Sequence, residues 1–387
     1  MPTTTLEITG AIAAALKKIW ANLTTFADVY PHDYTTHNVY LPRQAMNGHS
    51  AGSNVGWTTG FWPGLMWLAY ELSGKLEYRQ AGMLQAQRFA TRLREGIDID
   101  HHDLGFLYTL ACVAPWRLTG DDTVRHTAIQ AADQLLWRYF EHAGILQAWG
   151  CLDDPYERGR VIADSLMNLP LLYWAGEVTG AMHYIRAARR HASQIRDHLV
   201  RPDGSTFHTF YFDPETGVPL YGKTAQGAGD NSCWSRGQAW TIYGFVLSYN
   251  YTRDDSFLQA ACHVADYFLA HLPEDGVAYW DLVFTDGGTE ERDSSAAAIA
   301  VCGLLELARR LPVGTEVERY RFAVLWIIDS LIKKYSTMNN SASNALLLHG
   351  VYSKPDGIGV DEGNLWGDYF YLEALMRLAR PDWKPYW

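Results

Sequence analysis

The sequence predicts an all-α fold, namely an (α/α)6 barrel of six helical hairpins whose inner-helix N-termini line one mouth. Three observations support this prediction. Apolar residues recur at helical spacing through almost the whole chain. The helices come in pairs, in which a short polar turn joins an apolar helix to an amphipathic one. Every second helix is apolar on all sides, which indicates that it is buried on all sides.

The pairs recur along the chain at irregular intervals, which argues against a solenoid of identical repeats. The unit is clearest where Gly74, Gly120 and Gly180 end an apolar helix. The amphipathic partner helices are expected over residues 78–93, 121–140, 183–199, 256–272 and 317–334. An opening helix over residues 6–25 and a closing one over residues 363–378 bring the total to about twelve helices in six hairpins.

The chain is predicted to form a single domain over residues 1–387. A chain of this length can bury one large core, and no Pro/Gly/Ser-rich linker, charge run or low-complexity tract divides it. The N-terminus lacks a secretory signal pattern, and no run of about 18 apolar residues occurs. We therefore expect a cytoplasmic protein without a membrane partner, either a monomer or a weak homo-oligomer.

The net charge of -11 argues against nucleic acid and against an anionic membrane surface as partners. A small acidic substrate stays possible, because charges beyond about 8 Å are mostly screened at physiological salt. The 15 Trp and 23 Tyr suit the faces of sugar rings, although they serve plain packing equally well. The five cysteines are odd in number and show no C-x-x-C spacing, so the sequence indicates neither a disulfide framework nor a metal site.

The loops before the inner helices carry the unusual residues of the chain. Because those helices point the same way, their preceding loops should gather at one mouth, where the helix N-termini favour an anionic ligand. Six separate segments would contribute to this pocket, and they carry Trp57, His102 with Asp103, Trp149 with Asp164, Arg236 with Trp240, Asp293, and Trp366.

Asp103 and Asp164 each stand at the head of an apolar stretch that is expected to be a buried helix. Two carboxylates delivered to one mouth suggest acid/base chemistry. Taken alone, each aspartate is more typical of a helix N-cap. The same interpretation is preferred for Asp230 and Asp293, and His101 is expected to be solvent-facing or capping.

Five segments, in order along the chain, resemble the unsaturated glucuronyl hydrolases, family 88 of the glycoside hydrolases. The most distinctive is residues 224–245, which contain Trp-Ser-Arg-Gly-Gln-Ala-Trp followed by Ile-Tyr-Gly-Phe. The others are Trp-Thr-Thr-Gly-Phe-Trp at 57–62, His-Asp-Leu-Gly-Phe at 102–106, Ala-Asp-Ser-Leu-Met-Asn-Leu-Pro at 163–170, and Trp-Gly-Asp-Tyr-Phe-Tyr-Leu at 366–372.

The resemblance implies an enzyme that removes the terminal 4,5-unsaturated uronic acid from lyase-generated oligosaccharides by hydrating its C4=C5 enol ether. Asp164 would be the general acid/base, with its pKa raised by apolar walls and by an ionised Asp103. The resemblance places the sugar carboxylate near Gln226, Arg236 and Trp240. It assigns ring contacts to Trp57, His102, Trp149 and His208. No cofactor, metal or nucleotide is expected.

A charge argument adds to the assignment of Arg236, because a cation in an otherwise apolar helix needs an anion. The chain departs from the family pattern at Asn231 and Ser235, where no chemistry is expected. In the loop at 353–358, family members that favour sulfated sugars tend to carry Ser-x-x-Ser-x-Lys, and this chain keeps only the first Ser. Asp356 would repel a sulfate, so the sequence favours an unsulfated neighbouring sugar.

Three alternatives remain at this stage. Unsaturated rhamnogalacturonyl hydrolases of family 105 share the barrel and the chemistry but act on pectin fragments. A sugar epimerase on the same barrel would need a pair of His bases. A non-catalytic oligosaccharide-binding protein would keep the aromatic pocket without turnover.

Overall fold

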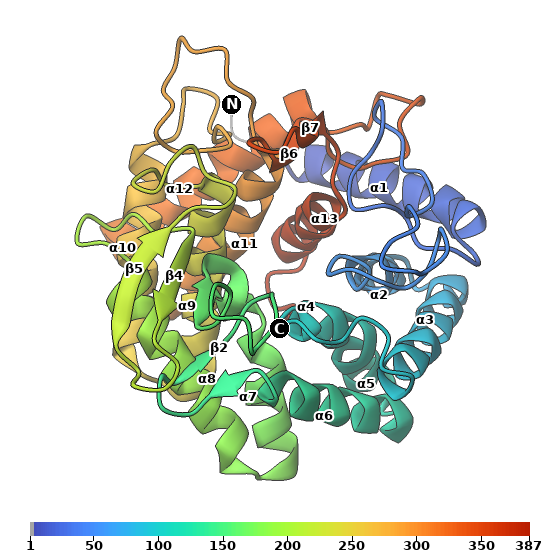
Figure 1. Cartoon of the computed structure of the whole chain (residues 1–387). Coiled ribbons are helices and arrows are strands. Elements are labelled where there is room, and N and C mark those ends of the chain that lie inside the picture. The colour runs from blue at the N-terminus through green and yellow to red at the C-terminus, as the bar shows by residue number, and fades with distance from the viewer. Residues whose placement is uncertain (1–3) are drawn as a thin grey trace.

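The computed structural model describes residues 4–387, which form two concentric rings of helices (Figure 1). The outer ring consists of α1 (Thr5–Thr25), α3 (Leu76–Arg94), α6 (Asp122–Leu136), α8 (Met182–Gln194), α10 (Asp255–Ala270) and α12 (Thr315–Ser330). The inner ring consists of α2 (Phe61–Ser73), α4 (Leu104–Tyr108) with α5 (Ala114–Thr119), α7 (Leu169–Thr179), α9 (Ser235–Thr252), α11 (Ser294–Arg310) and α13 (Leu365–Ala379). The predicted all-α fold of paired helices is confirmed.

The inner ring is closed because its last helix packs against its first. Helix α13 contacts both α11 and α2, and α9 contacts both α7 and α11. The inner helices are buried on nearly every side, whereas the outer helices are buried along one face only. Alternation between fully and partly apolar helices in the sequence therefore corresponds to alternation between the two rings.

Local sequence explains where the hairpins turn. Gly74, Gly120 and Gly180 adopt φ values of 71°, 71° and 74° and end α2, α5 and α7 in the left-handed conformation that glycine favours. In two hairpins, the outer helix begins directly after an aspartate that caps it, namely Asp121 before α6 and Asp254 before α10. Asp121 accepts a hydrogen bond from the amide of Thr123 at 2.8 Å, and Asp254 plays the same role before α10.

Several local expectations were wrong. The second inner helix, α4 with α5, is interrupted by the π-helical turn η1 (Thr109–Val113), because Pro115 lacks an amide proton and its ring would collide with the carbonyl of Ala111 in a regular helix. The amphipathic helix expected over 121–140 ends at Leu136. The helices expected over residues 183–199 and 317–334 are confirmed in extent, although α8 and α12 finish as the π turns η3 (Ile195–Leu199) and η4 (Leu331–Tyr335).

The barrel also carries seven short strands that the sequence did not predict. They form the β1 (Tyr139–Phe140) and β2 (Ile145–Leu146) pair, the antiparallel sheet of β3 (Arg160–Ile162), β4 (Thr209–Phe212) and β5 (Pro219–Lys223), and the β6 (Gly350–Ser353) and β7 (Ile358–Glu362) hairpin. Strands this short carry too little alternation to be recognised in a sequence. Among the described residues, no helix is long and apolar enough to cross a membrane.

A close contact between two inner helices positions the site. The segment η2 (Ala163–Met167) is a 3-10 turn that leads into α7. A Cβ on Gly105 would lie 2.2 Å from the Cα of Asn168, so no other residue type fits there. The side-chain oxygen of Asn168 accepts a hydrogen bond from the amide of Phe106 at 2.8 Å. The starts of α4 and η2 are thereby held against each other, and each carries one of the two aspartates.

Candidate active site

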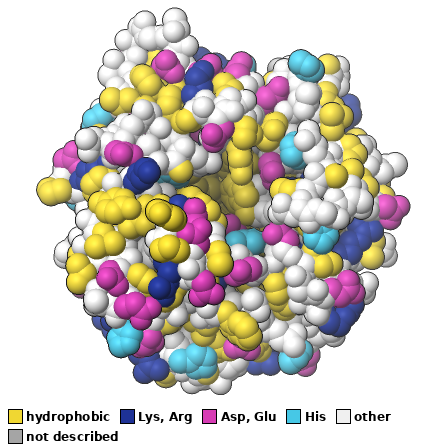
Figure 2. Space-filling model, viewed as in Figure 1, with side chains coloured by type: hydrophobic (Ala, Val, Ile, Leu, Met, Phe, Trp, Pro, Cys, Tyr) yellow, Lys and Arg dark blue, Asp and Glu magenta, His cyan; other side chains and the backbone are white. Residues whose placement is uncertain are grey.

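A cavity of about 330 Å³ opens at the N-terminal ends of the inner helices. Figure 2 shows it as a hollow in the middle of this face. Every residue to which the sequence assigned catalysis or substrate binding lines this cavity, namely Trp57, His102, Asp103, Trp149, Asp164, His208, Gln226, Arg236 and Trp240. Asp293 and Trp366, which the sequence also placed at this mouth, do not line the cavity. The sequence missed Ile162, Ala225, Trp234 and Tyr352 as lining residues, and it placed Asp356 only in a loop.

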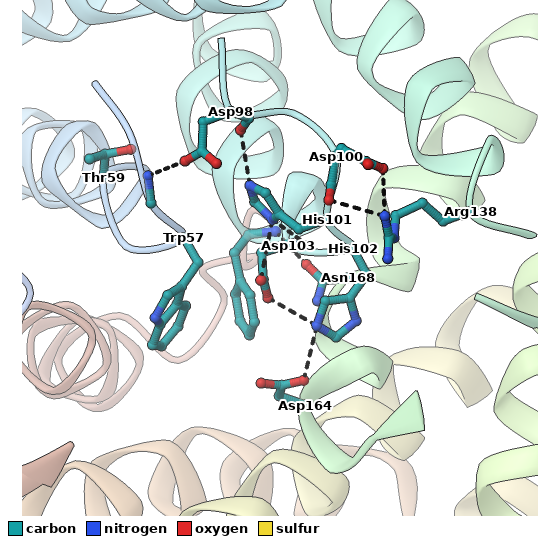
Figure 3. Close-up of polar contacts among 12 residues, drawn as sticks. Trp57, Thr59, Asp98, Asp100, His101, His102, Asp103, Arg138, Asp164 and Asn168 are labelled. Carbon is teal, nitrogen blue, oxygen red and sulfur yellow. Dashed lines mark hydrogen bonds and ion pairs between the residues drawn. The ribbon is translucent and has the colours of Figure 1, made fainter. Parts of the chain in front are cut away.

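Asp103 and Asp164 meet across the ring of His102 (Figure 3). The Nε2 atom of His102 lies 3.3 Å from Oδ1 of Asp103 and 3.5 Å from Oδ1 of Asp164. Asp103 occupies the N-cap position of α4, as the N-cap alternative predicted, but its side chain makes no capping hydrogen bond. Asp164 lies inside η2 rather than ahead of it, so the N-cap alternative is wrong for Asp164.

The two carboxyl groups are driven to opposite protonation states. Burial, followed by repulsion from Asp103, raises the pKa of Asp164 well above its ordinary value. Burial alone would also raise the pKa of Asp103. Attraction from the neighbouring His102, followed by the polar surroundings that His101 and Asn168 provide, outweighs burial and lowers the pKa of Asp103. One carboxyl group thus holds a proton while its neighbour is ionised, which is a typical arrangement for acid/base catalysis.

Of the two histidines beside the pair, only His101 differs from what the sequence suggested. Burial lowers the pKa of His102 to about 4, so its ring is uncharged near neutral pH. His101 was expected to be solvent-facing or capping, and this was wrong. Its Nδ1 atom accepts a hydrogen bond from the amide of Asp103 at 3.2 Å and lies 3.3 Å from the Asp103 carboxylate. His101 therefore supports Asp103 directly.

A buried histidine of the outer ring holds the turn that carries Asp164. Nδ1 of His191 accepts a hydrogen bond from the amide of Leu146 at 2.9 Å, which leaves the proton on Nε2. That nitrogen lies 2.8 Å from Oγ of Ser165, and Ser165 donates to the carbonyl of Ile162 at 2.6 Å. The residue next to Asp164 is thus fixed from both sides.

Arg236 is paired within the protein. Its NH1 group donates to Oδ2 of Asp293 at 2.8 Å, and its NH2 group donates to the carbonyl of Tyr352 at 2.7 Å. The premise that this cation needs a substrate anion was therefore wrong, because Asp293 already supplies one. Arg236 still lines the cavity, 3.5 Å from the side-chain oxygen of Gln226.

Asp293 combines this ion pair with the role predicted for it. Its Oδ1 atom accepts a hydrogen bond from the amide of Ser295 at 3.1 Å at the start of α11, so the N-cap prediction is confirmed. The same prediction was wrong for Asp230. That residue accepts a hydrogen bond from the amide of Thr224 within a loop, and Trp234 is the residue that precedes α9.

The pairing changes how Arg236 should be tested. Removing Arg236 alone leaves Asp293 as an unpaired buried charge, which costs about 3–5 kcal/mol of folding stability. We expect the double variant Arg236→Met with Asp293→Asn to avoid this cost, because asparagine is uncharged and still caps the helix.

The KM of this double variant should rise at least about tenfold, because a charged hydrogen-bond donor is lost from the cavity. Steady-state kinetics would check this, with Asp293→Asn alone as the control. An unchanged KM in the double variant would remove Arg236 from substrate binding.

His208 presents one defined donor to the cavity. Its Nδ1 atom accepts hydrogen bonds from the amides of Ala225 and Gln226 at 2.7 and 3.1 Å. Burial lowers the pKa of His208 to about 3, so the ring is neutral and its single proton lies on Nε2. That atom is buried and has no partner among the described residues. A hydroxyl or carboxylate of a bound sugar would satisfy it.

Aromatic rings form the walls and floor of the cavity. Trp57 packs against Trp366 with ring centroids 5.0 Å apart and donates from its indole nitrogen to the hydroxyl of Tyr352 at 3.1 Å. The ring centroid of Trp240 lies 5.1 Å from that of Phe106. The guanidinium of Arg160 lies 4.6 Å from the ring centroid of Trp149. These flat apolar faces suit a sugar ring.

The same cluster is the only one in residues 4–387 compact enough to hold a metal ion. The candidate ligand atoms of His102, Asp103 and Asp164 lie within 4.8 Å of one another. Metal binding would require all three ligands to be deprotonated, and burial together with repulsion from Asp103 raises the pKa of Asp164.

A barrel of paired helices with a proton-holding aspartate at an aromatic mouth defines a carbohydrate-active hydrolase. The chain belongs to glycosyl hydrolase family 88, whose family model matches residues 25–314. It is 46% identical over 385 residues to the unsaturated chondroitin disaccharide hydrolase of Streptococcus agalactiae, covering 99% of this chain and 94% of that protein.

Two solved structures agree with this assignment. The crystal structure of unsaturated glucuronyl hydrolase from S. agalactiae is 45% identical, covers 100% of this chain and 95% of its own, and superposes with a TM-score of 0.94. A mutant of that enzyme complexed with dGlcA-GalNAc6S is 43% identical over the same shares of both chains, with a TM-score of 0.87. The predicted family, fold and hydrolase activity are confirmed.

Proposed function

We propose that this hydrolase releases the terminal 4,5-unsaturated uronic acid from lyase-generated glycosaminoglycan oligosaccharides, such as those of chondroitin or hyaluronan. The reaction is hydration of the C4=C5 enol ether, with Asp164 as the general acid and base. One observation carries the proposal. Asp164 has a raised pKa, and its Oδ1 atom is buried in the cavity without a hydrogen-bond partner in the described chain.

The chemistry follows from that proton. Asp164 donates it to C4 of the double bond, and the resulting positive charge at C5 is shared with the ring oxygen. Water adds at C5 while the Asp164 carboxylate accepts a proton from it, so the catalyst returns to its starting state. The C5 hemiketal then opens to a ketone, and the sugar chain leaves from C1 as the exposed hemiacetal collapses to an aldehyde. The glycosidic carbon is never attacked by a nucleophile.

The remaining lining residues recognise the unsaturated ring in this proposal. Asp103 accepts hydrogen bonds from sugar hydroxyls and keeps the proton on Asp164. The sugar carboxylate binds near Gln226, Arg236 and Trp240. Ring contacts come from Trp57, His102, Trp149 and His208, as the sequence suggested.

The neighbouring sugar is expected to be unsulfated. Asp356 lines the cavity from the β6–β7 turn, where its Oδ2 atom accepts a hydrogen bond from Oγ of Ser353 at 2.6 Å. A sulfate on the adjoining sugar would approach this carboxylate and be repelled. The relative in complex with dGlcA-GalNAc6S binds a sulfated sugar, so this preference would distinguish the present chain from it.

Replacing Asp356 tests this preference. In Asp356→Asn we expect kcat/KM for a 6-sulfated unsaturated disaccharide to rise about threefold to tenfold at low salt, because an exposed like charge has been removed. The value for the unsulfated disaccharide should stay unchanged, which makes that substrate the internal control. The gain should disappear at high salt. Equal changes for both substrates would contradict a role for Asp356 in charge selection.

A direct assay tests the function itself. The protein is incubated with unsaturated chondroitin, hyaluronan and rhamnogalacturonan disaccharides, and the absorbance of the conjugated double bond is followed. Loss of signal on the first two supports the proposal, and loss on the pectin fragment alone would favour the rhamnogalacturonyl alternative. Tight binding without loss would indicate a binding protein. The epimerase alternative is weakened because His102 and His208, with pKa values of about 4 and 3, are poor bases.

Three further expectations stay predictions. They are a single domain over residues 1–387, a monomer or weak homo-oligomer, and a cytoplasmic location.

A further inference from the structure

Two buried arginines outside the cavity converge on the segment that carries Asp103. Arg92 lies in the last turn of the outer helix α3, and Arg138 follows the outer helix α6. Each is 1% exposed. Neither has an assigned role in the proposed reaction, and neither lines the cavity.

Arg92 holds one side of this segment. Its NH2 group donates to the backbone carbonyl of Asp98 at 2.7 Å. Its NH1 group donates to the carbonyl of Gly56 at 3.1 Å and to Oγ1 of Thr59 at 3.0 Å, on either side of Trp57. The amide of Gly56 in turn donates to Oδ2 of Asp98 at 2.5 Å (Figure 3). The loop of Trp57 is thereby tied to the loop of Asp103.

Arg138 holds the other side. Its NH1 group donates to the carbonyl and the carboxylate of Asp100, at 3.0 and 2.5 Å. Its Nε and NH2 groups donate to the carbonyls of Gln147 and Gly150 at 3.0 and 2.8 Å, on either side of Trp149. The amide of His102 also donates to the carbonyl of Ala148 at 3.1 Å. The loop of Trp149 is therefore tied to the same segment.

The segment between these two anchors requires restraint. Asp98 has a φ of 45°, a left-handed conformation that is unfavourable for a residue other than glycine. His101 within the segment lies 3.3 Å from the Asp103 carboxylate. A displacement of residues 98–102 would consequently be transmitted to the carboxylate that faces Asp164.

We propose that Arg92 and Arg138 are positioning residues that clamp the 98–103 segment between the loops of Trp57 and Trp149, and so fix Asp103 opposite Asp164. This inference rests on the proposed function of Asp164. The two cations act through backbone carbonyls and through the carboxylates of Asp98 and Asp100, and not on the substrate. They set the spacing of the catalytic carboxylates together with both aromatic walls.

The pH dependence of the rate separates positioning from the alternatives. If Arg138→Met lets Asp103 move away from Asp164, the pKa of Asp164 falls and the alkaline limb of kcat/KM shifts to lower pH. Loss of the cation's charge without movement would raise the carboxyl pKa values and shift that limb to higher pH. A purely structural role would lower the melting temperature and leave the limb in place.

The experiment compares Arg138→Met, Arg138→Lys, Arg92→Met and Arg92→Lys on an unsaturated disaccharide. We expect each to lower kcat about tenfold to a hundredfold and to move the alkaline limb down, because misplacement of a catalytic group by about 1 Å has effects of this size. Lysine should not rescue, because one ammonium cannot reproduce the fork that spans two loops. The matched control is Arg125→Met in α6, whose guanidinium donates to the carbonyl of Val178 and does not line the cavity.

A second measurement does not depend on turnover. Binding of the disaccharide to Asp164→Asn is measured by calorimetry with and without Arg138→Met, and we expect the second change to weaken binding at least about tenfold. Unchanged binding together with an unmoved alkaline limb in the lysine variants would overturn the clamp. If Asp164→Asn alone retained activity, the proposed function would fail instead, and the binding comparison would still report on the clamp.

Discussion

Asp164→Asn is expected to lose turnover at least about a hundredfold, and more where protonation of C4 limits the rate. The amide has nearly the same shape as the acid but cannot donate the proton that the enol ether requires. The buried carboxyl oxygen of Asp164 lies at the cavity without a hydrogen-bond partner, and its neighbour Asp103 has a lowered pKa, so Asp103 is a poor substitute as a proton donor. Initial rates on an unsaturated disaccharide, measured across pH, would check this.

The same variant should remain folded and should not lose stability at neutral pH. The pKa of Asp164 is raised in the folded protein, so the folded state binds the proton more tightly than the unfolded chain. That contribution is complete at acid pH and is lost as pH rises through the raised pKa. Asparagine does not ionise, so the variant avoids the cost of burying a charged carboxylate at high pH. Its melting temperature should equal or exceed that of the wild type above neutral pH.

Asp153→Asn, at an exposed aspartate that does not line the cavity, is the control for both measurements. Retention of more than about a tenth of the activity would contradict the role of Asp164.

The sequence predicted the barrel and the aspartate pair for a physical reason. Helical amphipathicity is local, so alternation between buried and half-buried helices can be recognised without knowing any contact. Once the inner helices are known to be parallel, the loops before them must meet. The proximity of Asp103 and Asp164 could therefore be predicted from the sequence, although the two residues are far apart in the chain.

The contacts that the sequence missed depend on long-range geometry. The partner of Arg236 is Asp293 at the start of the next inner helix, and nothing in either segment specifies that distance. Tyr352 and Asp356 reach the cavity on the β6–β7 hairpin. Its two short strands have no helical periodicity, so the sequence pattern did not predict this hairpin. Arg92 and Arg138 resemble ordinary surface arginines of amphipathic helices, and only the fold shows that both are buried.

Asp103→Asn should separate the two carboxylates by their pH dependence. Removing the negative charge beside Asp164 lowers the pKa of Asp164, because burial and then repulsion from Asp103 are the two largest causes that raise it. The general acid is then deprotonated over more of the neutral range, and the alkaline limb of kcat/KM moves to lower pH. We expect activity at neutral pH to fall about a hundredfold, with partial recovery on acidification.

The recovery distinguishes an electrostatic role of Asp103 from a role in binding alone. If Asp103 only accepted hydrogen bonds from sugar hydroxyls, its asparagine variant would show a higher KM at every pH and an unmoved alkaline limb. The measurement is a pair of pH profiles, for kcat and for kcat/KM, on the wild type and on Asp103→Asn. Asp164→Asn in the same series should show no recovery at any pH, because it has no proton to regain. A downward shift confined to Asp103→Asn would therefore assign the proton to Asp164 and the charge that retains it to Asp103.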